Sequence, residues 1–343
     1  MPATTTGKVL VTGANGYIAV WVVKSFLDKG YSVRGTVRSE AKTKHLTETF
    51  KAYGDKLEVV VVEDITKEDA FDEAVKGVDA IAHTASPFHL NADDPNELIT
   101  PAVKGTLSVL QSALKYGTTV KRIVVTSSTA AVISPDPNPR VFSEDDWNDP
   151  AIKEVEEKGR DASAASKYRA SKTLAERAAW DFVQKNKSKI GWDLVVLNPP
   201  YVFGPTLHEL DDPEKLNTSM LDWWSSVVKG RKDNETLTSV GSEYVDVRDI
   251  ALAHVLALQK EAAGGHRIII SSGPWKWQDW VNAARSIDAN LPAGNTSYDP
   301  SKAIHTTRYD TSRASKLLGI GYFGIGETTR DVIAQFKEKG WVA

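Results

Sequence analysis

The 343-residue sequence contains no cysteine, and it has no apolar run of the roughly 18 to 20 residues that cross a bilayer as a helix. Without cysteine, the chain has no disulfide bond, no thiolate nucleophile and no zinc-thiolate site. Its first seven residues, MPATTTG, also lack the basic start and the apolar segment of a secretory signal peptide. These absences predict a cytoplasmic protein that does not associate with a membrane.

An excess of positive charge is missing as well. The chain has 42 Lys and Arg against 45 Asp and Glu, a formal net charge of −3. A nucleic-acid partner requires a basic surface, and the seven histidines are scattered singly, without the spacing of metal ligands. We therefore expect no nucleic acid and no metal.

What the sequence does contain is an alternation of short β-branched runs with helical periodicity. Runs such as KVLVTG, LEVVVVED and KRIVVTSS read as strands buried on both faces. The pattern predicts an α/β fold, a Rossmann-type doubly wound parallel sheet mainly over residues 1–205, with a smaller, partly C-terminal lobe over 206–343. Segments of that lobe are expected to return to the sheet. We also expect a helix between LEVVVVED and VDAIAHTAS, and a hairpin near TLTSVGSEYV.

A glycine-containing turn, VTGANGYIA, joins the first strand to the first helix. Glycine at positions 13 and 16 lets the backbone turn tightly and approach a pyrophosphate, which the helix N-terminus then stabilises. The third position of the motif holds Ala19. An ordinary strand-to-helix turn is the alternative, because such turns are common. The residues expected to contact a dinucleotide here are Gly13, Asn15, Gly16, Tyr17 and Ile18.

The end of the second strand, SVRGTVRSEAK, lacks the carboxylate that usually binds the ribose hydroxyls of NAD. Arg38 and Lys42 stand there instead, and a guanidinium with an added ammonium suits a 2′-phosphate. This favours NADPH over NADH. The alternative is that both are solvated surface cations beside Glu40. The direction of Arg34 is left open.

Two further strand ends are expected along the same cofactor. Asp64 and Ile65 follow the third strand, where a side chain would lie beside an adenine ring. Thr84, Ala85 and Ser86 follow the next strand, at the carboxyl edge where ligands bind in open α/β sheets. Small residues at this place allow the cofactor to approach the backbone.

The segment SKYRASK places Tyr168 four residues before Lys172, in a stretch that reads as helix. Such a pair often does no more than share a wet helix face. Ser127 and Ser128 end a preceding strand at the same edge. A serine that holds a carbonyl oxygen, a tyrosine that donates a proton to it and a lysine that lowers the tyrosine pKa form a working set for carbonyl reduction. We assign these roles to Ser128, Tyr168 and Lys172.

At this point the sequence resembles the extended short-chain dehydrogenases/reductases, and within them the yeast-type methylglyoxal reductases, fungal carbonyl reductases and plant dihydroflavonol reductases. The resemblance rests on VTGANGYIA, HTASPF, VVTSSTAAV, YRASK, LNPPYVFGP and YVDVRDIALAH and covers nearly the whole chain. It implies that Ser128, not Ser127, is the catalytic serine. It further implies that Pro199 and Val202 border the nicotinamide and that Phe88 and Tyr201 help to form the substrate pocket.

Two positions depart from the family pattern. Lys104 stands where many relatives have asparagine, and Trp21 stands where many have histidine. A role for Lys104 stays open, and Trp21 is expected to pack in the core or at an interface.

The segment 205–225, which contains HELDDPEKLNTSMLDWW, is expected to cover the substrate from its position alone. The residues expected to contact the substrate are Phe88, Ser128, Thr129, Tyr201, Thr218, Met220 and Trp224, with Leu207 and Trp223 also in the covering segment.

The sequence therefore predicts an NADPH-dependent carbonyl reductase that acts on small-molecule aldehydes and ketones, from methylglyoxal-like dicarbonyls to aryl or bulky ketones. An NAD-dependent nucleotide-sugar epimerase or dehydratase shares the fold and the Tyr–Lys pair, and a non-catalytic NADPH sensor is a second alternative. The long amphipathic helices around residues 100–117 and 169–185 are of the type that forms four-helix dimer contacts, so a homodimer stays open beside a monomer.

Overall fold

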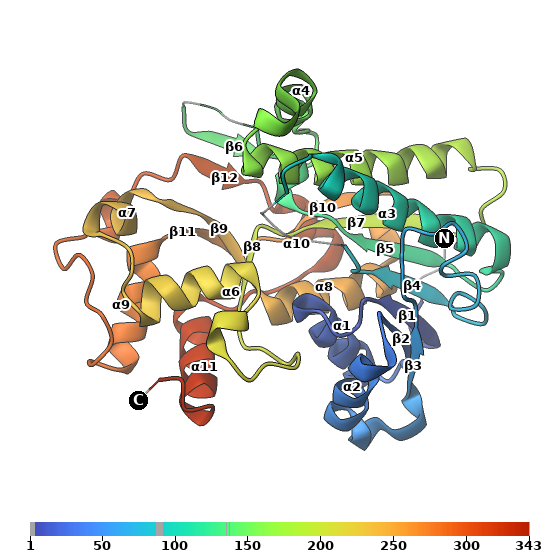
Figure 1. The fold of residues 1–343 in the computed structure, drawn as a ribbon, viewed down its shortest axis with the longest axis horizontal. Coiled ribbons are helices and arrows are strands. Elements are labelled where there is room, and N and C mark those ends of the chain that lie inside the picture. Colours follow the sequence, from blue (N-terminus) through green and yellow to red (C-terminus); the bar gives the residue numbers. More distant parts are fainter. Residues whose placement is uncertain (1–3, 87–91, 135, 137, 343) are drawn as a thin grey trace.

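The computed structural model describes residues 4–86, 92–134, 136 and 138–342. Its centre is a seven-stranded sheet in which every neighbouring pair of strands is parallel (Figure 1). In spatial order the strands are β10 (Arg267–Ile269), β7 (Asp193–Asn198), β5 (Arg122–Thr126), β4 (Ala80–His83), β1 (Lys8–Thr12), β2 (Ser32–Val37) and β3 (Leu57–Val61). The order reverses between β1 and β4, which confirms the predicted Rossmann-type doubly wound fold and marks the edge where ligands bind.

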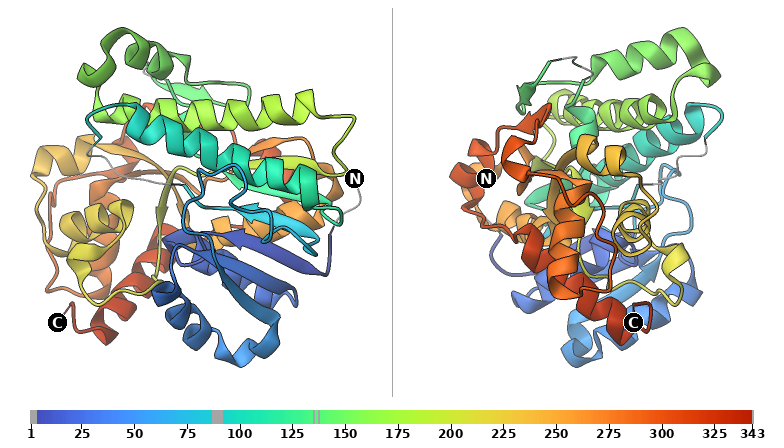
Figure 2. Two further views of the ribbon diagram at one scale, coloured as in Figure 1. Left: turned by 45° about the vertical axis from the view of Figure 1, so that its right-hand side comes forward. Right: turned by 90° about the vertical axis from the view of Figure 1, so that its left-hand side faces the viewer.

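Helices cover both faces of this sheet. One face carries α1 (Tyr17–Asp28), which packs against α8 (Val247–Gln259). The other carries α3 (Asn96–Tyr116) and α5 (Ala164–Lys185), which lie side by side in both views of Figure 2. The strands read as continuous apolar runs because this arrangement leaves them no wet face. Both α8 and β10 come from the second half of the chain and return to the sheet.

A second group of elements lies beside the sheet, at the left of Figure 1. It contains a three-stranded sheet of β11 (Gly273–Lys276), β9 (Gly241–Asp246) and β8 (Tyr201–Phe203). Its helices are α6 (Thr218–Trp223), continued by a π-helical turn over Trp224–Val228, α7 (Asn234–Ser239), α9 (Trp277–Ile287) and α11 (Ile325–Glu338). The strands β6 (Arg140–Phe142) and β12 (Thr307–Tyr309) form a separate pair, and the remaining helices are α2 (Thr43–Thr49), α4 (Asp149–Lys158) and α10 (Ser312–Leu318).

Aromatic side chains form the core of this second group. Trp275, Trp277 and Trp280 are all at most 1% exposed, and each lies within 6.0 Å of the Phe203 ring, centroid to centroid. Trp275 and Trp280 meet the Phe203 ring edge to face, an arrangement that is favourable for aromatic quadrupoles. The cluster fixes β8 against β9, β11 and α9, and thus fixes the segment that leaves β7 toward the second group.

Two predicted elements are wrong. Residues 236–245 do not form a hairpin, because α7 ends at Ser239 and β9 pairs with β11 and β8 instead. The segment between β3 and β4 is a series of turns, closed largely by separate bonds between residues three apart, such as Asp72 N to the Asp69 carbonyl at 3.1 Å. Burial of Phe71 and Val75 holds these turns in place.

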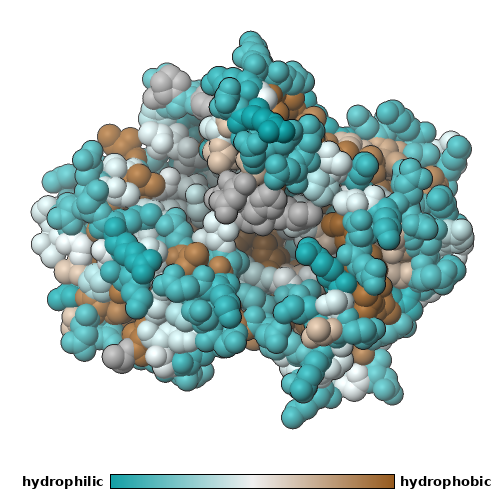
Figure 3. All heavy atoms as spheres, viewed as in Figure 1, coloured by the Kyte–Doolittle hydropathy of each residue, from teal (hydrophilic) through white to brown (hydrophobic). Residues whose placement is uncertain are grey.

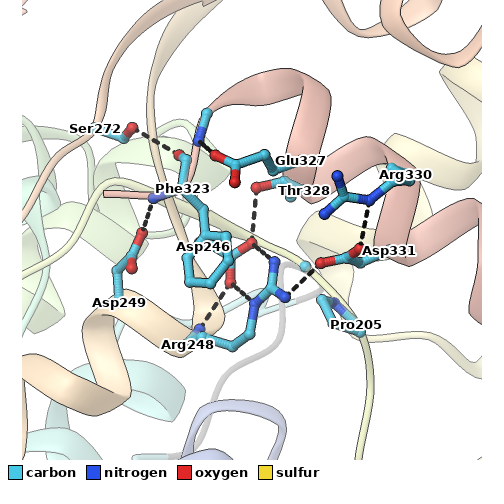
Figure 4. Close-up of polar contacts among 12 residues, drawn as sticks. Pro205, Asp246, Arg248, Asp249, Ser272, Phe323, Glu327, Thr328, Arg330 and Asp331 are labelled. Carbon is cyan, nitrogen blue, oxygen red and sulfur yellow. Dashed lines mark hydrogen bonds and ion pairs between the residues drawn. The ribbon is translucent and has the colours of Figure 1, made fainter. Parts of the chain in front are cut away.

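A polar network fastens α11 to the start of α8 (Figure 4). Asp246 caps α8 by accepting a hydrogen bond from the Arg248 backbone, and the Arg248 guanidinium bridges Asp246 at 2.8 Å and Asp331 at 2.5 Å. The Thr328 hydroxyl donates to Asp246 at 2.7 Å, and the guanidinium lies 3.7 Å from the Phe323 ring centroid. These contacts hold the C-terminal helix in place.

Over the described residues, no helix is long and apolar enough to cross a membrane. The same residues contain no group of three or more His, Asp or Glu side chains arranged to hold a metal ion.

Candidate active site

The turn between β1 and α1 leaves room for an anion. Gly13 has φ +65°, a conformation that favours glycine, and a Cβ there would lie 3.1 Å from the Ala85 Cα. Gly16 precedes α1 without a capping side chain, so the first N–H groups of the helix stay available to a ligand. A pyrophosphate fits this turn, which carries only small groups where it must approach the backbone.

Tyr17 and Trp21 on α1 are directed toward the second group of elements. The Tyr17 hydroxyl donates to the Gly204 carbonyl at 2.9 Å, and Trp21 Nε1 donates to the Pro205 carbonyl at 2.8 Å. Trp21 is partly buried against the core, as expected. The phenol of Tyr17 is therefore engaged with protein, while Asn15 and Ile18 beside it are half-buried.

The two cations predicted for the 2′-phosphate differ. Arg38 is exposed and, across the described ranges, forms no ion pair or hydrogen bond. Lys42 instead pairs with Glu209 at 2.9 Å, so a phosphate must compete with that carboxylate. Arg34, whose direction was left open, bonds Glu58 at 3.0 Å and the Ala74 carbonyl at 2.9 Å. Arg34 is thus a structural residue, whereas Arg38 has no ion-pair partner within the described part of the chain.

The side chains of Asp64 and Ile65 lie in different surroundings. Asp64 is exposed and accepts hydrogen bonds from the Thr66 hydroxyl at 2.7 Å and the Thr66 N–H at 2.9 Å, which lower the pKa of its carboxyl. Ile65 packs against α3, where a Cβ on Gly105 would lie 2.8 Å from its Cδ1. Contact of either residue with an adenine ring stays a prediction.

The end of β4 is tied to both the glycine turn and α5. Thr12 Oγ1 accepts hydrogen bonds from the backbone N–H groups of Thr84 and Ala85, both at 3.1 Å. Ser86 Oγ accepts one from Lys172 Nζ at 2.9 Å. These bonds bring the three predicted residues 84–86 between the glycine turn and the predicted catalytic lysine.

Ser128, Tyr168 and Lys172 meet at the carboxyl edge of the sheet. Ser128 Oγ accepts a hydrogen bond from the Ala130 N–H at 3.1 Å and bonds the Tyr168 side chain. Lys172 Nζ lies 5.9 Å from the centroid of the Tyr168 ring. Helix α5 begins after Ser163, whose side chain caps it, so the helix places Tyr168 and Lys172 one turn apart on one face.

Burial dominates the pKa values of this set. It raises the pKa of Tyr168 above its ordinary value, although the hydrogen bond to Ser128 acts in the opposite direction. Burial also lowers the pKa of Lys172 to about 8. The Lys172 ammonium donates its hydrogen bond to Ser86, and the lowering of the Tyr168 pKa by the lysine charge stays a prediction.

The residues expected around a substrate differ in their exposure. Tyr201 is 44% exposed and Thr218 is exposed, whereas Thr129 is buried and shares a hydrogen bond with Tyr309. Tyr309 was missed, because a three-residue strand gives no periodic signal. Phe88 lies outside the described residues. Pro199 accepts a hydrogen bond from the Thr129 N–H at 2.9 Å, and Val202 is buried in β8.

Met220 and Trp224 do not line an open pocket. Met220 has no exposed surface, and its sulfur accepts a hydrogen bond from the Gly204 N–H at 3.4 Å. Trp224 is buried between Phe336 and Trp341, with ring centroids 5.2 and 6.4 Å away. Met220 and Trp224 were expected to contact the substrate, but the structure places both in the core, and Trp223 is buried as well. Large apolar side chains gain the most free energy when they are removed from water.

The space-filling view shows a hollow near the centre of one face, between the two groups of elements, with hydrophobic atoms inside it (Figure 3). A concave, largely apolar site with a few polar groups is the usual form of a small-molecule site.

Comparison with known proteins agrees with this geometry. The model of the NAD dependent epimerase/dehydratase family matches residues 9–272. An Aspergillus niger ketoreductase is 35% identical over 346 residues, covering 97% of this chain and 98% of the relative. The NADPH-dependent methylglyoxal reductase of Saccharomyces cerevisiae is 35% identical over 344 residues, covering 96% and 97%.

A solved structure is similar over the same span. The yeast methylglyoxal/isovaleraldehyde reductase complexed with NADPH superposes with a TM-score of 0.88 at 33% identity, covering 98% of this chain and 100% of that one. The chain therefore belongs to the NAD dependent epimerase/dehydratase family, the extended short-chain dehydrogenases/reductases.

Proposed function

We propose that this protein is an NADPH-dependent carbonyl reductase, an oxidoreductase that converts aldehydes and ketones to alcohols. The proposal rests on one observation: Ser128, Tyr168 and Lys172 lie together beside Ser86. Ser86 follows β4, which pairs with β1, the strand that leads into the glycine turn. The relatives named above, a ketoreductase and a methylglyoxal reductase, support the same reaction class.

The catalytic side chains act on the carbonyl oxygen. Bound NADPH supplies the hydride for the carbonyl carbon. Tyr168 carries its proton at neutral pH, as any phenol with a pKa of about 10 or above does, and burial raises that pKa further, so it can donate the proton to the oxygen. Ser128 holds the same oxygen by a hydrogen bond. Lys172, next to Ser86, adds positive charge as the phenolate forms.

The residues present fit NADPH. The glycine turn accepts a pyrophosphate, and Arg38 is free for a 2′-phosphate where NAD enzymes carry a carboxylate. The proposed contacts are Gly13, Asn15, Gly16, Tyr17, Ile18, Arg38, Lys42, Asp64, Ile65, Thr84, Ala85, Ser86, Tyr168, Lys172, Pro199 and Val202.

The substrate is a small-molecule carbonyl compound, and methylglyoxal-like dicarbonyls and aryl or bulky ketones are the proposed range. Ser128, Thr129 and Tyr201 are the proposed contacts, with Thr218 at the rim and Phe88 added from the sequence. The nucleotide-sugar epimerase or dehydratase alternative is not favoured, since Thr129 and Ala130 follow the serine where dehydratases of the superfamily usually have an acidic pair.

Several wider features belong to the same proposal. Residues 1–205 form mainly the cofactor lobe, and residues 206–343 form mainly the substrate lobe. The enzyme acts in the cytoplasm without a nucleic-acid or membrane partner, and α3 with α5 offers a face for a homodimer.

The proposal is tested by the loss of NADPH absorbance with methylglyoxal and with an aryl ketone, and by the same assay with NADH. We expect the oxidation of NADPH to depend on the carbonyl compound. With NADH in place of NADPH, the same reaction should be much slower. Cofactor binding without turnover on either carbonyl would contradict the proposal.

A further inference from the structure

A buried ion pair lies behind the catalytic serine. Glu176 on α5 accepts a hydrogen bond from Arg267 on β10, with 2.5 Å between Oε1 and Nε. The two side chains are 0% and 8% exposed. Glu176 stands one turn after Lys172 and two turns after Tyr168 on the same helix, so it lies close to their face of α5.

The second oxygen of Glu176 holds the strand ends that carry the site. Oε2 accepts hydrogen bonds from Ser127 Oγ at 2.6 Å and from Asn198 Nδ2 at 2.8 Å. The same Asn198 amide group also donates to the Ser128 carbonyl at 3.1 Å. One carboxylate thus restrains Ser128 from two directions, through the residue before it and through the neighbouring strand.

Arg267 is itself fixed from the far side. Its Nη1 donates to the carbonyls of Glu144 and Asp146, both at 2.8 Å, and its guanidinium lies 3.6 Å from the Trp147 ring centroid. The pair therefore connects α5, β5, β7 and β10 at one edge of the sheet.

Glu176 also borders the active site directly. A cavity of about 20 Å³ is lined by Glu176, Ser127, Ser86 and Lys172. The carboxylate and the catalytic lysine are walls of the same small space, so a shift of α5 against β5 moves both.

A buried ion pair contributes little net stability compared with apolar side chains of the same volume. Here, however, Glu176 accepts hydrogen bonds from Ser127, the residue before the catalytic serine, and from Asn198, whose amide group also donates to the Ser128 carbonyl. We propose that Glu176, held by Arg267, is a positioning residue that fixes Ser128 relative to Tyr168. This inference rests on the proposed reductase function and adds a residue to it.

The test compares three variants of the full-length protein. Glu176→Gln keeps the shape but removes the charge that holds Arg267. Ser127→Ala removes one of the two links to Ser128 and leaves the ion pair intact. Asp193→Asn is the control, because it breaks the pair between the partly buried Asp193 and the buried Arg122 at the opposite ends of β5 and β7.

We expect Glu176→Gln to lower kcat about 10- to 100-fold, with the KM for NADPH within about twofold of native, because the serine is displaced and not the cofactor. Ser127→Ala should lower kcat about threefold by the same route. Asp193→Asn should leave kcat per folded molecule unchanged, although it destabilises the fold. If instability alone lowered the activity, the decrease in kcat would parallel the decrease in thermal stability across all three variants.

Hydrogen exchange provides a readout that does not depend on activity. The N–H groups of Ser127 and Thr129 bond the carbonyls of Leu197 and Pro199 at 2.9 Å. They should exchange faster in Glu176→Gln and not in Asp193→Asn. Unchanged kcat in both Ser127→Ala and Glu176→Gln, or unchanged exchange in Glu176→Gln, overturns the inference. If Glu176→Gln does not fold, Ser127→Ala decides. An inactive native protein counts against the reductase function, while the exchange comparison still decides the role of Glu176.

Discussion

An arginine–carboxylate pair lies at each end of strands β5 and β7, and the two pairs differ in what surrounds them. At the amino ends, Arg122 bonds Asp193 at 2.6 and 2.8 Å, and its remaining donors reach the carbonyls of Ala257, Lys260 and Glu261. At the carboxyl ends, Glu176 divides its oxygens between Arg267, Ser127 and Asn198.

Buried polar atoms without a hydrogen bond occur at both ends among the described residues. Asn198 Oδ1, Arg267 Nη2 and His83 Nε2 lie at the carboxyl ends, and Trp192 Nε1 lies just before β7. The contrast therefore rests on the partners of the two carboxylates: Asp193 bonds its arginine, whereas Glu176 also holds the strand ends that carry the reactive groups.

The largest expected effect comes from Tyr168→Phe, at the carboxyl edge. Loss of the proton donor should lower kcat about 10²- to 10⁴-fold, while the free energy of unfolding changes by only about 1 kcal/mol. Steady-state kinetics and urea unfolding measure the two. The matched control is Tyr31→Phe, which removes a buried hydrogen bond to the Thr4 carbonyl at 2.6 Å just before β2. It should lose similar stability and no activity; equal loss of activity in both would remove the distinction between the edges.

Asp193→Asn, at the amino edge, should have the opposite profile. It leaves the fully buried Arg122 guanidinium without its charge partner, so the free energy of unfolding should fall by roughly 3 kcal/mol. Urea unfolding measures the loss, and kcat at a temperature where the variant is folded should equal that of the native protein. A tenfold drop in kcat would show that both edges shape the active site.

Arg38→Ala concerns the carboxyl edge again, with a smaller effect. Loss of a charge-assisted contact to the 2′-phosphate should weaken NADPH binding by about 1.5 to 3 kcal/mol, and NADH binding should not change. Fluorescence titration with both cofactors measures this. Lys42→Ala should weaken NADPH less, because Lys42 is already paired with Glu209. Equal weakening of both cofactors by Arg38→Ala would assign Arg38 to another part of the cofactor.

Asp249 lies outside both edges and should affect only the pH dependence of stability. Burial, with the nearby Asp246 charge, raises the pKa of Asp249 to about 7. Between about pH 4 and 7, Asp249 is therefore protonated in the folded state and ionised in the unfolded state. Its contribution to the free energy of unfolding falls as the pH rises through this range. Asp249→Asn should gain stability relative to native from about pH 5 to 8.

The control for that experiment is Asp331→Asn. Its partner Arg248 lowers the pKa of Asp331 despite burial, so this carboxylate stabilises the fold above its unfolded pKa and the stabilisation is lost in acid. Denaturant unfolding across pH should give opposite trends for the two variants. The same trend in both would contradict the assignment of Asp249.

The sequence predicted those parts of the site that depend on local pattern. Gly13 and Gly16 mark a turn that only small residues allow, and Tyr168 with Lys172 is spaced by one helical turn. The buried strands were visible as apolar runs. These signals are contained in a few neighbouring residues, so a single sequence suffices to find them.

Features that depend on distant pairing were missed or wrong. The expected hairpin failed because β9 finds its partners in β8 and β11. Trp224 was expected to contact the substrate, but the distant Phe336 and Trp341 bury it. Glu176 reads as one charge on a helix, and only the fold brings Arg267 to it from 91 residues away.

The reductase function is tested most directly by where the hydride goes. NADPH deuterated at both C4 positions of the nicotinamide is incubated with the protein and an aryl ketone, and the alcohol is analysed by mass spectrometry and NMR. We expect one deuterium on the former carbonyl carbon, formed by the native protein and much more slowly by Tyr168→Phe. An alcohol without deuterium, or full recovery of ketone and NADPH, would contradict carbonyl reduction by this site.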